Sequence, residues 1–542
     1  MEENSLWYKK AVFYQVYVRA YCDSNGDGHG DLRGLASKLD YLQATGIDCL
    51  WLMPLYTSPL LDDGYDIAGY KDLLPEYGSL EDLKSLLDEA HKRGLRVILD
   101  LVLNHTSDQH PWFQSARQDP KSPFREYYVW SDDERKYSRA RIIFLDTQKS
   151  NWTWDEAAGQ YFWHRFYPSQ PDLNYDNPAV QSEMLEVARF WLEMGVDGFR
   201  ADAVPYLFER EGTNCESLPE THAFLRRLRR FIDENFPGRI LLCEANQWPE
   251  EVREYFGEGD EFQMGFHFPL MPRIFMALRS GEISPLTWAL SKTPAIPESC
   301  QWCAFLRNHD ELTLEMVTEA DRQWMWEQYA PEPRMRLNLG IRRRLAPLLG
   351  NERSLLELAF SLLLSLPGSP VIYYGDEIGM GDNIDLFDRN GVRTPMQWDG
   401  SAGAGFSQAR LQDFYAPLIS EGEFGHQRVN VQRQENEAGS LLSWLRQALR
   451  IRKAHPIFGM GDMTLLESGN PSVLAFERRF GEERLLVLHN LSRRKQTVKL
   501  EMEPGTMPRP EVIYGYAKGM PDFNFYRPFE MEASTYLWLK IT

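Results

Sequence analysis

Short apolar runs alternate with helical patterns along the first hundred residues. Residues 12–18, 47–52 and 95–101 each read as a strand, and leucines at helical spacing fill the stretches between them. Because these strands are apolar on both faces, they suit a parallel sheet that its own crossover helices cover on both sides. The pattern therefore predicts an α/β fold.

The alternation resumes after residue 172 and predicts five more strands. They span 196–200, 239–243, 262–267, 301–306 and 370–374. Eight strands joined by helical crossovers predict a (β/α)8 TIM barrel, formed by residues 1–104 and 172–457.

Three segments break the barrel pattern. Residues 105–171, after the third strand, are rich in proline, aromatic and charged residues. Because a loop of this length without secondary structure is uncommon in a compact domain, we expect an inserted subdomain. Residues 311–352 form a second insertion near the expected pocket, and it either covers the pocket or decorates the surface. Short alternating segments then predict a C-terminal antiparallel β-sandwich, residues 458–542.

Charge and composition exclude some partners. The 542 residues carry a formal net charge of −20, which argues against nucleic acid, because phosphate binding needs a basic face. We find no apolar stretch long enough for a membrane span and expect no signal peptide. Six cysteines with one isolated CxxC pair, Cys300 and Cys303, make a reducing cytoplasm the expected compartment.

Four predicted strands end in charged or polar residues. The segments are 100–105, 198–202, 243–246 and 305–310. A TIM barrel gathers the C-terminal ends of its strands around one pocket, so Asp202, Glu244 and Asp310 should meet there. Packing alone does not explain acids, an arginine and histidines at these positions together.

Two carboxyl groups on neighbouring strands suit the retaining cleavage of a glycosidic bond. That reaction needs a nucleophile and an acid about 5–5.5 Å apart, and Asp202 and Glu244 fit these roles. Arg200 points to the same side of its strand as Asp202 and would keep that carboxylate ionised. Apolar residues before Glu244 would raise its pKa towards that of a general acid. Asp310 and His309 would stabilise the positively charged transition state.

The four segments resemble the signature regions of the α-amylase family of retaining glycoside hydrolases and transferases, and the likeness covers nearly the full chain. The resemblance implies that Asp202 is the nucleophile, Glu244 the acid/base and Asp310 the transition-state stabiliser. Its sugar-holding positions match Asp62, Tyr65, His105, Gln170, Arg200, His309 and Arg389. Phe144 and Phe166 could wall the sugar pocket, but nothing local distinguishes them from core aromatics.

Within the family, residues 170–174 resemble the oligo-1,6-glucosidase-like branch, which acts on short α-glucosides. Residues 305–312 and the arginine-rich insertion after them are most similar to members that isomerise the α-1,4 linkage of maltose to the α-1,1 linkage of trehalose. The alternatives are a plain α-glucosidase or oligo-1,6-glucosidase with a wetter pocket, and a barrel that has lost catalysis and serves as a binding subunit. The intact acids argue against the last. The resemblance also implies a homodimer, and no organic cofactor is expected.

The glycine-rich loop 23–31 places oxygen atoms at alternate positions, which suits a hard cation such as Ca2+. Its ligands would be Asp23, Asn25, Asp27, His29 (through its carbonyl) and Asp31. Gly34 stands where an EF-hand has its bidentate glutamate, so an EF-hand is rejected, and a hydrogen-bonded turn without metal is the alternative. The family resemblance implies a second structural Ca2+, held by Asn104, Asp172, Glu209 and the carbonyls of Tyr206 and Leu207.

Overall fold

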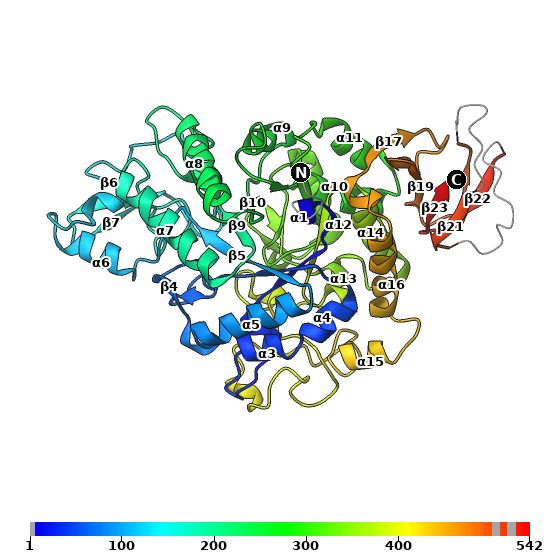
Figure 1. Ribbon diagram of the computed structural model, residues 1–542, viewed down its shortest axis with the longest axis horizontal. Coiled ribbons are helices and arrows are strands. Elements are labelled where there is room, and N and C mark those ends of the chain that lie inside the picture. Colours follow the sequence, from blue (N-terminus) through cyan, green and yellow to red (C-terminus); the bar gives the residue numbers. More distant parts are fainter. Residues whose placement is uncertain (1–5, 501–509, 517–526, 542) are drawn as a thin grey trace.

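Eight parallel strands close into a barrel in the computed structural model, which describes residues 6–500, 510–516 and 527–541 (Figure 1). The strands are β1 (Phe13–Val16), β2 (Cys49–Leu52), β5 (Arg96–Val102), β9 (Gly198–Asp202), β10 (Ile240–Cys243), β11 (Met264–Phe266), β12 (Gln301–Phe305) and β16 (Ser369–Tyr373). Each pairs with its neighbours in chain order, and β16 closes the ring against β1. The predicted (β/α)8 barrel is confirmed.

Crossover helices cover the outside of the barrel. The longer ones are α5 (Leu80–Lys92), α7 (Pro178–Met194), α8 (Pro219–Asn235), α10 (Leu270–Ser280), α14 (Arg353–Ser365) and α16 (Leu441–Ala454). In α5 the buried face consists of Leu83, Leu86, Leu87 and Ala90. This spacing puts one apolar stripe against the strands, as the pattern of an amphipathic helix requires.

One predicted helix is broken in two. The leucines between residues 32 and 42 share one helical pattern, but the chain forms α3 (Leu32–Ala36) and α4 (Leu39–Thr45). The hydroxyl of Ser37 donates to the carbonyl of Gly34 at 2.6 Å. Such a bond to the preceding turn competes with the helical ladder, which accounts for the break at this residue.

The segment 105–171 forms a small unit of its own. It contains α6 (Pro111–Gln118) and an antiparallel sheet in the order β6 (Trp130–Ser131), β8 (Gln160–Trp163), β7 (Trp152–Asp155). The unit lies at the left end of the molecule in Figure 1. Helix α6 was not expected from the sequence, because proline and aromatic residues hide its short helical repeat.

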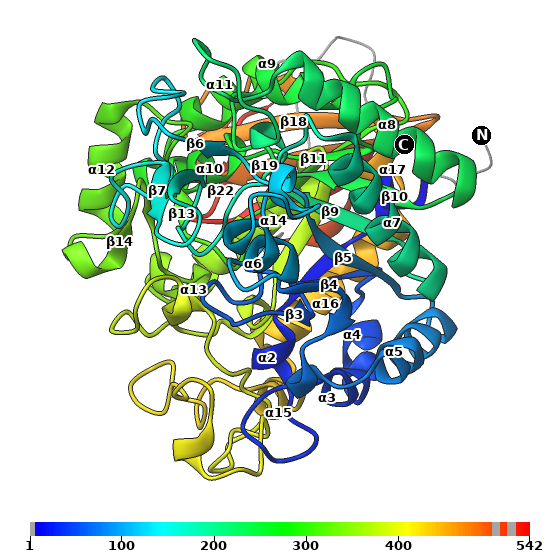
Figure 2. The ribbon, with the colours of Figure 1, turned by 90° about the vertical axis from the view of Figure 1, so that its left-hand side faces the viewer.

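The segment 311–352 contains one helix and a second small sheet. The helix is α12 (Glu319–Tyr329), and β15 (Gly340–Ile341) pairs with both β13 (Leu312–Thr313) and β14 (Arg336–Leu337). In Figure 2, α12 and β14 lie beside the unit that contains β6 and β7. A hydrogen bond at 2.7 Å from the N–H of Asn338 to the carboxylate of Asp146 joins the two insertions directly.

The chain ends in two antiparallel sheets at the right of Figure 1. One has the order β17 (Asp462–Leu466), β18 (Val473–Phe480), β19 (Glu483–Asn490), β23 (Tyr536–Ile541), β21 (Pro510–Gly515), and the other pairs β20 (Gln496–Val498) with β22 (Phe529–Met531). Leu486, Val498 and Met531 belong to one apolar cluster between them. The predicted antiparallel C-terminal domain is confirmed. Residues 1–5 of the predicted barrel, and 501–509, 517–526 and 542 of this domain, lie outside the described residues.

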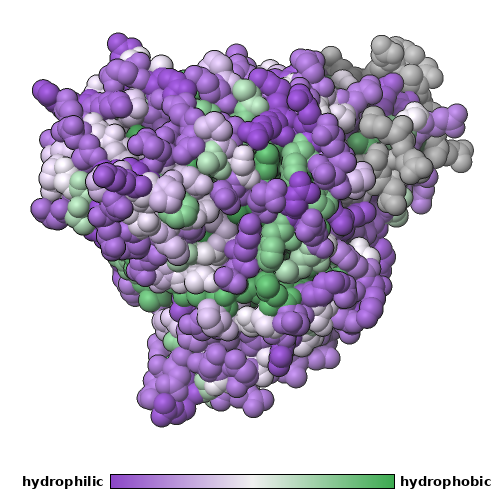
Figure 3. Space-filling model, turned by 60° about the vertical axis from the view of Figure 1, so that its left-hand side comes forward, coloured by the Kyte–Doolittle hydropathy of each residue, from purple (hydrophilic) through white to green (hydrophobic). Residues whose placement is uncertain are grey.

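The face shown in Figure 3 is mostly hydrophilic, and its apolar side chains gather in a band across the middle. Within the described ranges, every helix is too short or too polar to cross a bilayer.

Candidate active site

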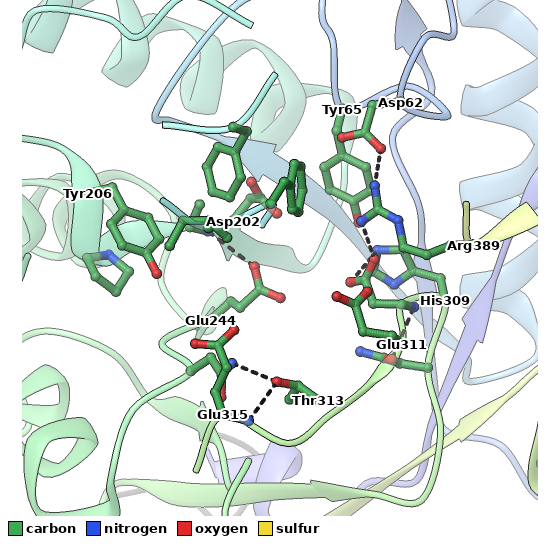
Figure 4. A pocket seen from close by; sticks show the side chains of 18 of the residues that line it. Asp62, Tyr65, Asp202, Tyr206, Glu244, His309, Glu311, Thr313, Glu315 and Arg389 are labelled. Atoms are coloured by element: carbon green, nitrogen blue, oxygen red, sulfur yellow. Dashed lines mark hydrogen bonds and ion pairs between the residues drawn. The ribbon is translucent and has the colours of Figure 1, made fainter. Parts of the chain in front are cut away.

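A cavity of about 140 Å3 lies at the C-terminal ends of the barrel strands (Figure 4). Asp202 is the last residue of β9, Glu244 directly follows β10, and Asp310 lies in the loop after β12. All three line the cavity. The cavity also includes seven of the residues predicted to hold sugar, which are Asp62, Tyr65, His105, Phe144, Phe166, His309 and Arg389.

Arg200 holds two of the acids together. It is 1% exposed, pairs with Asp202 at 2.6 Å, and also pairs with Asp100 and with Glu244. The register of β5 and β9 sets Asp100 opposite Arg200, so the arginine is anchored from the neighbouring strand. Because one guanidinium group contacts both carboxyl groups, Asp202 and Glu244 face one point, as retaining chemistry requires.

The pKa values of these two carboxyl groups differ. Burial raises the pKa of Glu244 to about 8, and the charges of Asp202 and Asp310 add to this effect while Arg200 opposes it. Burial also raises the pKa of Asp202 to about 6, helped by the charge of Asp100 and opposed by Arg200. At pH 7, Glu244 is therefore mostly protonated and Asp202 mostly ionised. A general acid and a nucleophile need this division.

Asp310 carries a firmly held negative charge. Its Oδ1 accepts from Arg389 at 2.7 Å and from Arg393 at 3.2 Å, and its Oδ2 lies 3.0 Å from Nε2 of His309. Burial acts to raise the pKa of Asp310, but His309 and the two arginines outweigh it and hold the pKa well below its usual range. The carboxylate thus stays ionised and can offset positive charge on a sugar ring.

Two predicted residues support the cavity without lining it. Gln170 donates to Oδ2 of Asp62 at 3.0 Å, and Asp62 in turn pairs with Arg389. Arg200 acts through the carboxylates it binds. The structure therefore brings all of the predicted catalytic and sugar-holding residues into one network, ten of them on the cavity surface.

Aromatic rings wall the cavity. The ring of Tyr65 stacks on that of His309 with centroids 5.3 Å apart, and Phe166 contacts His105 at 5.3 Å and Phe144 at 5.5 Å. Burial lowers the pKa of His105 to about 3, so its ring is neutral and can both donate to and accept from hydroxyl groups. Phe144 and Phe166 line the cavity. The local sequence alone could not distinguish this position from one in the core.

Several residues that line the cavity were not predicted as site residues from the sequence. They are Ile143, Ala203, Pro205, Asn246, Phe268, Asn308, Glu311, Thr313 and Glu315. Tyr206, predicted only as a carbonyl ligand of calcium, presents its side chain to the cavity. Asn246 had a signal, since it follows Glu244 by two residues and so shares its side of an extended chain. Glu311 and Glu315 lie in the segment 311–352, which was expected near the pocket, but no local pattern singled out these two side chains.

The two insertions meet across the cavity wall. Arg141 pairs with Glu315 at 2.5 Å and donates to the hydroxyl of Tyr206 at 3.1 Å. Both partners line the cavity. Together with the bond between Asn338 and Asp146, this contact joins the subdomain to the segment 311–352 beside the cavity.

The loop 23–31 satisfies its own carboxylates. Asp23 accepts from three backbone N–H groups of the loop at 2.7–3.0 Å, and Asp31 accepts from Ser24 and from the N–H of Gly34. In the described part of the chain, no three His, Cys, Asp or Glu side chains are grouped so as to hold a metal. The loop is a hydrogen-bonded turn, and calcium at this position stays a prediction.

The second candidate cation position has unpaired oxygen atoms. Oδ1 of Asn104 and Oδ2 of Asp172 are buried without a hydrogen-bond partner among the described residues. Burial raises the pKa of Asp172 to about 8, and burial together with the charge of Asp172 raises the pKa of Glu209. Buried amide and carboxylate oxygens without donors suit a hard cation, so these residues fit Ca2+.

Comparison with known proteins agrees with this geometry. The chain matches the alpha amylase catalytic domain over residues 15–333 and 340–461, and the maltogenic amylase C-terminal domain over residues 463–520. It belongs to the α-amylase family and is a carbohydrate-processing enzyme.

The relatives of this chain include several trehalose synthases. The trehalose synthase/amylase of Mycobacterium tuberculosis (strain ATCC 25618 / H37Rv) is 56% identical over 94% of this chain and 86% of its own length. The trehalose synthase of Pimelobacter sp. (strain R48) is 56% identical over 92% and 90%. An oligo-1,6-glucosidase of Parageobacillus thermoglucosidasius is 30% identical over 91% and 92%. Among solved structures, the trehalulose synthase of Pseudomonas mesoacidophila MX-45 superposes with a TM-score of 0.79 at 27% identity over 99% of both chains.

Proposed function

We propose that this protein is a trehalose synthase, which isomerises maltose to trehalose by intramolecular transfer of a glucosyl group, with minor hydrolysis to glucose. The observation that carries the proposal is the pair Asp202 and Glu244, held by one arginine in a small walled cavity, with pKa values of about 6 and about 8. The 56% identity to named trehalose synthases supports this substrate pair over that of the 30% identical oligo-1,6-glucosidase.

In the first step, the ionised Asp202 attacks the anomeric carbon of the non-reducing glucose unit of maltose. The bond from this carbon to the bridging oxygen breaks, and Glu244 gives its proton to that oxygen, so neutral glucose departs and a glucosyl ester forms on Asp202. Asp310 offsets the positive charge that develops on the sugar ring.

In the second step, the released glucose turns within the cavity and presents its anomeric hydroxyl. Glu244, now ionised, takes the proton of that hydroxyl, whose oxygen attacks the glucosyl carbon and frees Asp202. Two inversions leave the α configuration, and the product is α-1,1-linked. Water would attack the same ester, so the contact between Arg141 and Glu315 favours transfer over hydrolysis by restricting water.

The runner-up is an α-glucosidase or oligo-1,6-glucosidase that uses the same residues with water as the acceptor. Incubation of the purified protein with maltose, followed by chromatographic separation of the sugars, decides between the two. We expect trehalose as the main product and a minor share of glucose. Glucose alone would reject the synthase and favour the hydrolase, and an Asp202→Asn variant, expected to be inactive, controls for contaminating enzymes.

We also propose a structural calcium ion held by Asn104, Asp172 and Glu209, with the carbonyls of Tyr206 and Leu207. The buried oxygen atoms without donors at Asn104 and Asp172 support it. The ion would stabilise the junction of barrel and inserted unit, while the retaining chemistry proceeds through carboxylates alone.

A reducing compartment such as the cytoplasm fits this protein. Its six cysteines all lie in the described part of the chain, where each is buried and free of disulfide bonds. Its small-molecule partners would be maltose and trehalose, and the homodimer that the family resemblance implies stays a prediction.

A further inference from the structure

A second cavity, of about 420 Å3, lies at the opposite end of the barrel from the candidate active site. Lys10 ends α1 (Trp7–Lys10) shortly before β1, Asp48 directly precedes β2, and Arg96 begins β5. All three line this cavity, which therefore opens at the N-terminal ends of the strands. Arg452 and Lys453, from the end of α16, complete its charged wall.

The wall of this cavity is basic in an acidic protein. Four lining side chains are lysine or arginine and one is a carboxylate, whereas the whole chain has a net charge of −20. The carboxylate, Asp48, is engaged by Lys453 at 2.7 Å and by the N–H of Val12 at 2.9 Å. Arg96 pairs with Asp197 at 3.2 Å and lies over the ring of Trp7 at 4.5 Å.

Arg452 is buried without a carboxylate partner among the described residues. It is 3% exposed, its Nη atoms donate to the carbonyls of Leu364 and Gly368, and its Nε has no hydrogen-bond partner there. Carbonyls at the end of α14 offset part of the charge, because a helix C-terminus is its negative end. A buried guanidinium that is only partly compensated still favours an anion nearby.

A second buried arginine adds to the positive charge. Arg478 is 1% exposed and, within the described residues, donates only to backbone carbonyls. Burial and the charge of Arg452 lower the pKa of Arg478 to about 9, so the two guanidinium groups repel each other. An anion in the cavity beside Arg452 would relieve this repulsion.

We propose that this cavity binds the phosphate group of a small sugar phosphate. Guanidinium and ammonium groups are the side chains that bind phosphate, and Arg452 and Lys453 present one of each. The volume of about 420 Å3 leaves room beyond a phosphate ion for a small sugar. Inorganic phosphate shares the recognised group and is the other source to be distinguished.

Calorimetric titration with glucose 6-phosphate and with inorganic phosphate, at constant ionic strength, tests the proposal. Lys453→Glu reverses a charge in the wall on an exposed side chain, and we expect it to weaken binding of both probes by about tenfold or more. The matched control is Lys84→Glu, because Lys84 is also an exposed lysine paired with a carboxylate, that of Asp88. We expect binding to the control, and turnover of maltose by both variants, to equal those of the unaltered protein.

Tighter binding of glucose 6-phosphate than of inorganic phosphate would support the sugar phosphate as the ligand, and equal affinities would support the phosphate site while rejecting the ester as its specific ligand. Absence of saturable binding by either probe, no loss in Lys453→Glu, or an equal loss in Lys84→Glu would overturn the proposal. None of these outcomes involves the catalytic acids. The phosphate proposal can therefore fail while the proposed function holds, and the proposed function can fail while the phosphate proposal holds.

Discussion

Asp100→Asn should move the acid limb of the pH profile to lower pH. Asp100 is buried beside Arg200, and its charge helps to raise the pKa of Asp202. Asparagine keeps the shape and can still accept from Nε1 of Trp51, now 2.7 Å from the Asp100 carboxylate. The substitution keeps the shape of the side chain and removes both its charge and the oxygen that accepts from Nη1 of Arg200.

The size of the shift follows from the geometry. The carboxylates of Asp100 and Asp202 both contact Nη1 of Arg200, and the contact of Asp202 is 2.6 Å long. The two negative charges therefore lie about 5 Å apart. At an effective dielectric constant of about 20, this repulsion amounts to about 3 kcal/mol, or about 2 pKa units. Burial also raises the pKa of Asp100 to about 6, so this carboxylate carries only part of its charge at the acid limb. The limb, expected near pH 6 in the unaltered protein, should therefore fall by about 1 unit in Asp100→Asn.

The assay is kcat/KM for trehalose formation from maltose between pH 4 and 9. In the unaltered protein, activity should fall below about pH 6 as Asp202 gains a proton and above about pH 8 as Glu244 loses one. Asp197→Asn removes a buried, arginine-paired carboxylate at the other end of the barrel and should leave both limbs in place. An acid limb that stays near pH 6 or rises in Asp100→Asn would refute the reasoning.

Other predictions concern closure and metal. Arg141→Ala loses the contact with Glu315 and should raise the share of glucose among the products of maltose several-fold, measured by sugar chromatography; an unchanged share would show that this contact does not restrict water. Chelation with EDTA should lower the melting temperature, added Ca2+ should restore it, and Asn104→Ala should abolish that response; a chelator without effect on the unaltered protein would remove the calcium proposal. In the chelated protein, Asp172 keeps its proton to about pH 8 when folded but only to about pH 4 when unfolded, so the free energy of unfolding should fall as pH rises between these values; a flat denaturant-midpoint profile would contradict this.

The barrel could be predicted because its strands are buried on both faces and so read as unbroken apolar runs. Asp202, Glu244 and Asp310 could be predicted from the same topology, since the carboxyl ends of parallel strands converge. The break at Ser37 could not, because a single side-chain hydrogen bond decides it. The position of Arg141 beside the cavity could not be predicted either, because the sequence of a loop without hydrophobic periodicity does not show where the loop runs.

The pKa of Asp202 could not be predicted from the sequence either. Arg200 does lower the pKa of Asp202, as expected, but burial and the charge of Asp100 prevail. This balance depends on the register between β5 and β9, which sets Asp100 opposite Arg200. Spacing along the chain does not specify that register.

The most direct measurement is to trap the covalent intermediate. The protein is incubated with a fluorinated α-glucosyl fluoride, whose slowed second step lets the glucosyl ester accumulate, and its peptides are analysed by mass spectrometry. We predict one fluoroglucosyl group on the peptide that contains Asp202, and none in Asp202→Asn. A label on another residue, or inactivation without any covalent label, would contradict the account.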